Sequence, residues 1–76
     1  MSNHQLDARR MLCPMPVIRT QNAIKSLSPG DHLEITCTDP GAINDIPAWC
    51  RINGHRFIDY RQDGDEIILN VEVGTD

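Results

Sequence analysis

The segment Cys13-Pro14-Met15-Pro16 has the residue types and spacing that indicate chemistry in this sequence. Proline is favoured in the first turn of a helix, because the amide that it lacks has no intrahelical acceptor there. The residues after Pro16 follow a helical pattern, so we place Cys13 at the N-cap and the next three residues at the first helical positions. Neither proline has an N–H, so the amide of Met15 is the capping donor left to the sulfur.

A cysteine at a helix N-terminus is an activated thiol. The positive end of the helix dipole favours the thiolate, and such positions lower the cysteine pKa from about 8.5 to between about 3.5 and 7.5. Arg9, Arg10 and Arg19 would act in the same direction if the fold brings them near Cys13, and we select Arg10 and Arg19 as the supporting residues. The two prolines hold the turn stiff. No histidine or carboxylate adjoins the thiol as a base, which favours delivery of the sulfur to another protein over turnover of a bound small molecule.

The other two cysteines, Cys37 and Cys50, need separate explanations. Three cysteines cannot form a complete set of intramolecular disulfides, and reduced thiols are expected in the cytoplasm. Without a C-x-x-C pair or zinc-finger spacing of histidines, we expect no metal and no cofactor. Cys37 lies on the apolar side of an alternating strand and is predicted to be core. For Cys50, a helix face partly covered by the sheet is favoured over a resolving cysteine. Trp49 fits either packing or docking.

Length and composition indicate a single domain over residues 1–76, with 39% hydrophobic and 24% charged residues. No apolar run is long enough to span a membrane, and the start lacks the apolar core of a secretory signal, so we expect a cytoplasmic protein. The net charge is −4, but residues 1–29 carry +3 and the remainder −7. An acidic total of this kind argues against general nucleic-acid binding.

The hydrophobic pattern predicts four strands and two helices in the order β-α-β-α-β-β. The strands are expected at Gln5–Arg9, His32–Thr38, Arg56–Arg61 and Glu66–Val73, with a tight turn at Asp63-Gly64. The first helix should run from Pro14 to Leu27, with Val17, Ala23, Ile24 and Leu27 on its apolar face. The second should start near Pro40 with Thr38 or Asp39 as its cap, be kinked or split at Pro47, and end at Asn53-Gly54.

Each predicted helix has one apolar stripe, so both can cover one face of a single sheet in a two-layer α/β sandwich of the α+β type. A right-handed crossover should make the first two strands parallel, and the last two should form an antiparallel hairpin.

The segments LDARRMLCPMPVI, SPGDHLEI, TDPGAINDIPAWC and GHRFIDYRQDGDEI resemble the TusA-like (SirA/TusA/YedF) family of small sulfur carriers, from about Leu6 to Val73. The resemblance implies a four-stranded mixed sheet, and it implies that Cys13 carries sulfane sulfur as a persulfide. The donor would be a cysteine desulfurase or a rhodanese-type protein, and the receiver an acceptor sulfurtransferase. Family members serve tRNA thiolation, sulfur oxidation or cofactor biosynthesis.

The sequence departs from that family around the thiol. Many relatives have glycine at the position of Arg10, arginine at that of Leu12 and glutamate at that of Met15. The helix-cap argument needs none of those side chains. The surface around the thiol does change, so we expect a different partner.

Two other functions remain open beside the carrier. One is a thiol–disulfide redox protein that uses Cys13 and Cys50, and the other is a non-catalytic regulatory binding module. If the chain is an enzyme, it is at most a sulfurtransferase with a Cys13 persulfide intermediate. The carrier is favoured, because redox pairs usually sit in one short motif.

Overall fold

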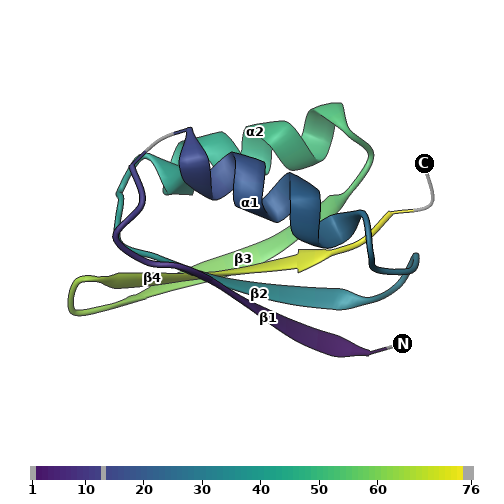
Figure 1. Ribbon diagram of the computed structural model, residues 1–76, viewed down its shortest axis with the longest axis horizontal. Helices are drawn as coiled ribbons and strands as arrows, with labels where there is room; N and C mark the ends of the chain where they lie inside the picture. The colour runs from purple at the N-terminus through teal and green to yellow at the C-terminus, as the bar shows by residue number, and fades with distance from the viewer. Residues whose placement is uncertain (1, 13, 75–76) are drawn as a thin grey trace.

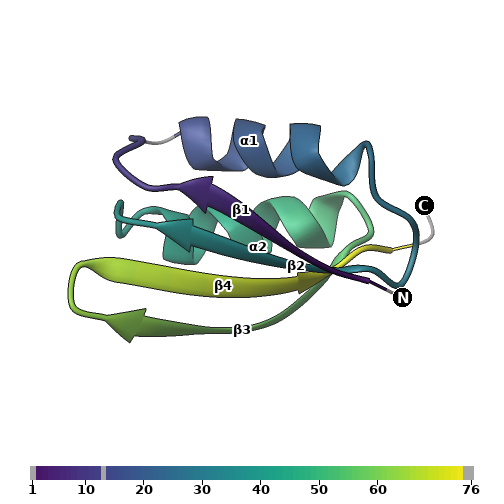
Figure 2. The same ribbon diagram turned by 60° about the horizontal axis from the view of Figure 1, so that its bottom comes forward.

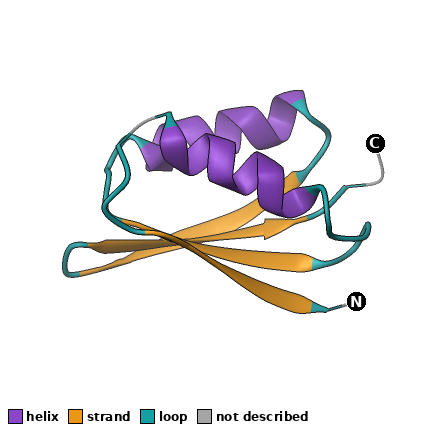
Figure 3. Ribbon diagram, in the orientation of Figure 1, coloured by secondary structure: helices purple, strands orange, loops and turns teal. Residues whose placement is uncertain are grey.

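A computed structural model describes residues 2–12 and 14–74 of the chain. Six elements follow one another: β1 (Asn3–Ala8), α1 (Met15–Ile24), β2 (His32–Cys37), α2 (Ala42–Ile52), β3 (Arg56–Asp63) and β4 (Glu66–Glu72). The strands form one layer and both helices lie on the same face of it (Figures 1 and 3). The predicted two-layer α+β sandwich and its element order are confirmed.

The four strands form one mixed sheet in the order β1-β2-β4-β3, which Figure 2 shows from the side of the strands. β1 and β2 are parallel, as the right-handed crossover through α1 predicts. β4 is antiparallel to both of its neighbours, β2 and β3. The last strand of the chain therefore lies inside the sheet, and β3 forms an edge.

Alternation along the two central strands builds the core. In β2, Leu33, Ile35 and Cys37 are buried, and in β4 the residues Leu69 and Val71 are fully buried on the same face. Successive side chains of a strand point to opposite faces, so one face of the sheet is apolar beneath the helices. The other face of these two strands carries mainly polar side chains, together with the buried Ile68.

The predicted apolar face of the first helix packs against the core, together with two residues that were not predicted, Pro16 and Thr20. Its buried residues are Pro16, Thr20 and Ile24. The Thr20 hydroxyl donates to the carbonyl of Pro16 at 2.8 Å, which satisfies the polar group within the core. Val17, Ala23 and Leu27 are partly buried and pack against the core, as predicted. The helix also ends at Ile24, three residues before the predicted Leu27.

The second helix continues through Pro47. α2 runs without interruption over Ala42–Ile52 with Pro47 inside it, so the predicted split is wrong, and the alternative of a kink stays a prediction. Packing of Ala42, Ile46 and Cys50 on the sheet compensates for the hydrogen bond that proline cannot donate. Gly54 (φ 79°) ends the helix as the predicted C-terminal cap.

Neither of the two predicted caps, Thr38 or Asp39, is the N-cap of α2, which is Gly41. The Asp39 carboxylate accepts from the Gly41 amide at 3.0 Å, although the helix itself begins one residue later and has no side-chain cap. Thr38 has another role, because its hydroxyl oxygen accepts from the backbone of Arg10.

Smaller differences concern the ends of the strands. β1 covers Asn3–Ala8 instead of Gln5–Arg9. The hairpin turn is made by Gly64 and Asp65, because Asp63 still pairs with Glu66. In the part of the chain that the structure describes, neither helix has the length and apolarity needed to cross a membrane.

Asp31 ties three segments together at the end of the molecule that holds the start of β1. Its carboxylate accepts from the amides of Ser28 and Ser2, at 2.9 and 3.1 Å, and lies 3.5 Å from the His4 imidazole. The bonds from Ser28 and Ser2 hold the pKa of Asp31 below its ordinary value. The loop after α1 is thereby anchored to β1 and β2.

Candidate functional site

The sequence places the reactive thiol at Cys13, and this residue lies outside the described part of the chain. Its neighbours Leu12 and Pro14 are described, and they lead into α1. The start of α1 lies at the same end of the molecule as the ends of β1 and β2 and the turn between β3 and β4 (Figure 1). The candidate site is built here from the described residues around that end.

The backbone at the start of α1 differs from the predicted cap in register. The N-cap is Pro14 and the helix begins at Met15. The Met15 amide donates to the carbonyl of Leu12 at 2.9 Å, and the amides of Val17 and Ile18 donate to the carbonyl of Pro14 at 3.1 and 3.2 Å. The Met15 amide thus has a backbone acceptor, in contrast to its predicted use as the donor to sulfur. The positive end of the α1 dipole remains at this turn.

Apolar side chains are exposed beside this turn. Leu12 is 77% exposed, Met15 43% and Ile18 40%. Leu12 and Met15 are joined by a backbone hydrogen bond, and Ile18 lies one turn further along the helix from Met15. Met11, by contrast, packs against the core. Of the two methionines that flank Cys13, one is a packing residue and the other a surface residue.

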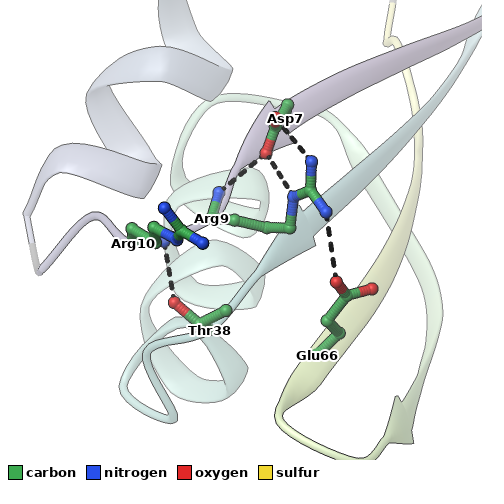
Figure 4. A network of polar contacts seen from close by, with 5 residues as sticks. All are labelled: Asp7, Arg9, Arg10, Thr38 and Glu66. Carbon is green, nitrogen blue, oxygen red and sulfur yellow. Dashed lines mark hydrogen bonds and ion pairs between the residues drawn. The ribbon is translucent and has the colours of Figure 1, made fainter.

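An ion-pair network holds the end of β1 in place. Arg9 pairs with Asp7 at 3.0 Å and with Glu66 of β4 at 3.3 Å (Figure 4). Hydrogen bonds from Arg9 lower the pKa of Asp7 to about 2. The sequence did not identify Glu66, because it is 57 residues from Arg9. The charge of Arg9 is therefore compensated within the protein.

Arg10 has an unusual backbone conformation. With a φ of 65° it is the one non-glycine residue in the left-handed region among those described. Its amide donates to the Thr38 hydroxyl at 2.8 Å, which joins the turn after β1 to the end of β2 (Figure 4). Glycine adopts this conformation without steric cost, and an arginine at this position gave no sequence signal for a left-handed turn.

The two predicted supporting arginines lie at the same end of the molecule. Arg10 lines an open depression together with Asp7, Arg9, Thr38, Asp65 and Glu66. Arg19 is exposed on α1 and contributes, after Arg9, to lowering the pKa of Asp7. Both cations are therefore near the end of β1.

The other two cysteines belong to the core. Cys37 and Cys50 are both 0% exposed. Burial raises the pKa of the Cys50 thiol to about 11, which disfavours the thiolate. Trp49 is partly buried against the core and stacks on His55 with ring centroids 5.1 Å apart, so of its two predicted roles the structure favours packing.

Comparisons with known proteins agree with this architecture. A family model described as "Sulfurtransferase TusA" matches residues 4–73. YrkI of Bacillus subtilis (strain 168) is 38% identical over 73 residues, which cover 96% of this chain and 97% of YrkI. The "Sulfur carrier protein TusA" of Pseudomonas paraeruginosa (strain DSM 24068 / PA7) is 36% identical over 58 residues, or 76% of this chain and 73% of that protein.

The fold has a solved counterpart as well. The crystal structure of a SirA-like protein from Desulfitobacterium hafniense superposes with a TM-score of 0.81 at 22% sequence identity. The match covers 95% of this chain and 99% of the other.

Proposed function

Because the chain belongs to the TusA family of sulfur carrier proteins, we propose that it accepts sulfane sulfur as a persulfide on Cys13 and passes it to an acceptor protein. The donor is a cysteine desulfurase or a rhodanese-type protein. The acceptor is a sulfurtransferase of tRNA thiolation, sulfur oxidation or cofactor biosynthesis.

The observation that carries this proposal is the complete burial of Cys37 and Cys50. A thiol that exchanges sulfur with a second protein must be reached by a sulfur atom of that protein. Neither buried thiol meets this requirement, so Cys13 is the cysteine left for the carrier role. The same burial, together with the raised pKa of Cys50, argues against a redox protein in which Cys50 resolves a disulfide with Cys13.

The transfer needs no external oxidant or reductant. The Cys13 thiolate attacks the terminal sulfur of the donor persulfide. A new S–S bond forms at Cys13, the S–S bond of the donor breaks, and the donor cysteine leaves as a thiolate. The proton of the terminal SH group remains with the transferred sulfur. Delivery to the acceptor repeats the exchange in the opposite sense, with Cys13 as the leaving thiolate.

The surroundings of the turn suit such an exchange. The N-terminus of α1 favours a negative charge on Cys13 both before loading and when it leaves. Pro14 and Pro16 restrict the backbone of the turn, and Pro16 is fully buried. Exposed Leu12 and Met15 offer an apolar contact surface beside it. An apolar surface of this kind should select a different partner from the one that a charged surface would select.

Intact-mass spectrometry tests the proposal. The protein and its Cys13→Ser, Cys37→Ser and Cys50→Ser variants are incubated with a cysteine desulfurase and cysteine, or with a rhodanese and thiosulfate, without reductant. We expect the mass of one additional sulfur atom on every protein except Cys13→Ser, and its loss on reduction. Persulfide on Cys13→Ser, or no gain from either donor, would contradict the carrier function. A binding module would instead keep its activity in Cys13→Ser.

A further inference from the structure

The Arg10 side chain makes no contribution to the turn in which it lies. The turn requires a left-handed residue, and the amide of that residue donates to Thr38. Glycine would satisfy both requirements, with less steric strain than arginine. Residues kept in this conformation despite the strain are concentrated at functional sites.

The guanidinium of Arg10 also has no partner among the described residues. Among the described residues, the hydrogen bond from Arg10 to Thr38 comes from its backbone amide, and the residue is exposed. Its neighbour Arg9 gives a direct comparison, because Asp7 and Glu66 neutralise it. Arg10 therefore makes no ion pair among the described residues, whereas its neighbour Arg9 makes two, and both arginines line the same depression as Asp65.

The charge of the surrounding segment is one-sided. Residues 8–30 contain four cations, Arg9, Arg10, Arg19 and Lys25, and no Asp or Glu, although the whole chain has a net charge of −4. The exposed apolar side chains Leu12, Met15 and Ile18 belong to the same segment. Apolar residues with charges at their margin are the usual arrangement of a protein–protein interface.

We infer that Arg10 is a specificity-determining residue, which contacts a carboxylate on the sulfur-donating protein docked over Leu12, Met15 and Ile18. The inference rests on the proposed carrier function. We choose the sulfur donor as the protein that docks on this surface, because the donor binds the carrier before the carrier is loaded. Recognition by the donor therefore depends entirely on the carrier's own side chains. An acceptor also has the transferred sulfur to recognise. The donor surface should be apolar with carboxylates at its margin.

The test compares Arg10→Gln, which removes the charge but retains a side chain at the strained position, with Arg10→Lys, which keeps the charge. Arg51→Gln is the matched control, since Arg51 lies in the last turn of α2 at the opposite end of the molecule (Figure 1). Initial rates of persulfide loading by a cysteine desulfurase are measured against carrier concentration. A parallel measurement gives the rate of Cys13 alkylation by iodoacetamide, which is a neutral reagent that needs no docking.

Loss of one exposed ion pair should raise the KM for Arg10→Gln about 2- to 5-fold with kcat unchanged. Arg10→Lys should recover most of the loss, and Arg51→Gln should behave as the parent. The difference between parent and Arg10→Gln should shrink as salt is added. Alkylation rates should be equal in all four proteins, because this inference assigns Arg10 to the partner in place of the thiolate-supporting role predicted from the sequence.

Equal KM values for the parent and Arg10→Gln would overturn the inference. Slower alkylation of Arg10→Gln would also overturn it, since Arg10 would then act on the thiol instead of on the partner. If the parent itself is not loaded, the carrier function fails, and that outcome is distinct from both others.

Discussion

Replacement of Arg10 by glycine should stabilise the protein. A left-handed conformation costs an L-residue about 1–2 kcal/mol, and Arg10 has a φ of 65°. Glycine avoids that cost but loses about 0.5–1 kcal/mol more conformational entropy on folding. The hydrogen bond from the backbone of residue 10 to Thr38 does not depend on the side chain. The expected net gain is about 0.5–1 kcal/mol.

Thermal and urea unfolding followed by far-UV circular dichroism measure this gain. In a domain of this size, 1 kcal/mol shifts the midpoint by about 4–8 °C, so Arg10→Gly should melt about 2–8 °C above the parent. Arg10→Ala is the control, because alanine removes the same charge and keeps the strained conformation. It should unfold close to the parent.

Two results would refute this reasoning. If Arg10→Gly and Arg10→Ala have the same stability, the backbone conformation is not the source of strain. If both are less stable than the parent, the arginine side chain makes stabilising contacts in the folded protein. The expected result is that Arg10→Gly is more stable than the parent and that its loading by the desulfurase has a higher KM.

Three further outcomes follow from other parts of the structure. Cys50 should resist iodoacetamide in the native protein and react only on unfolding, because its thiol is fully buried with a pKa of about 11; peptide mapping that finds native labelling would contradict this burial. Because the folded pKa of Asp31 is lowered, its stabilising contribution is present above the unfolded value of about 3.9 and is lost as pH falls through the folded value. Urea midpoints of Asp31→Asn should therefore fall less between about pH 5 and pH 2 than those of the parent, and equal slopes would refute the linkage. Gly74→Ala should lower the free energy of unfolding by about 1–3 kcal/mol, because the added Cβ would lie 1.7 Å from the Gly54 carbonyl oxygen. Gly41→Ala is the control in urea unfolding, because a Cβ there would have no neighbour nearer than 3.5 Å. Equal stabilities of the two variants would argue against the close contact at Gly74.

The sequence by itself predicted the features that depend on local patterns of residues. The order of elements, the parallel pair of first strands and the glycine cap of the second helix follow from periodicity and turn residues within short windows. Cys13 was selected because its two prolines and the resemblance to a family are visible in the chain itself. Family membership is now shown by the match over residues 4–73, and the persulfide on Cys13 stays a prediction.

Several features depended on contacts that no short window contains. The position of β4 between β2 and β3 pairs Cys37 with Ile67, and the partner of Arg9 on β4 is equally distant in sequence. The helix through Pro47 persists because its apolar side packs on the sheet, and packing outweighs a lost backbone bond. Periodicity predicted that Cys50 faces the sheet, but its complete burial required both layers to be in place.

The surface around the candidate thiol shows the same division. Sequence alone determined its composition: a cysteine followed by two prolines, apolar neighbours and an excess of cations. The tertiary structure decided which of those groups are available, because Arg9 is neutralised by Asp7 and Glu66, whereas Arg10 is held by its backbone alone. Charge is a property of the residue, but compensation of charge depends on which strands the fold brings together.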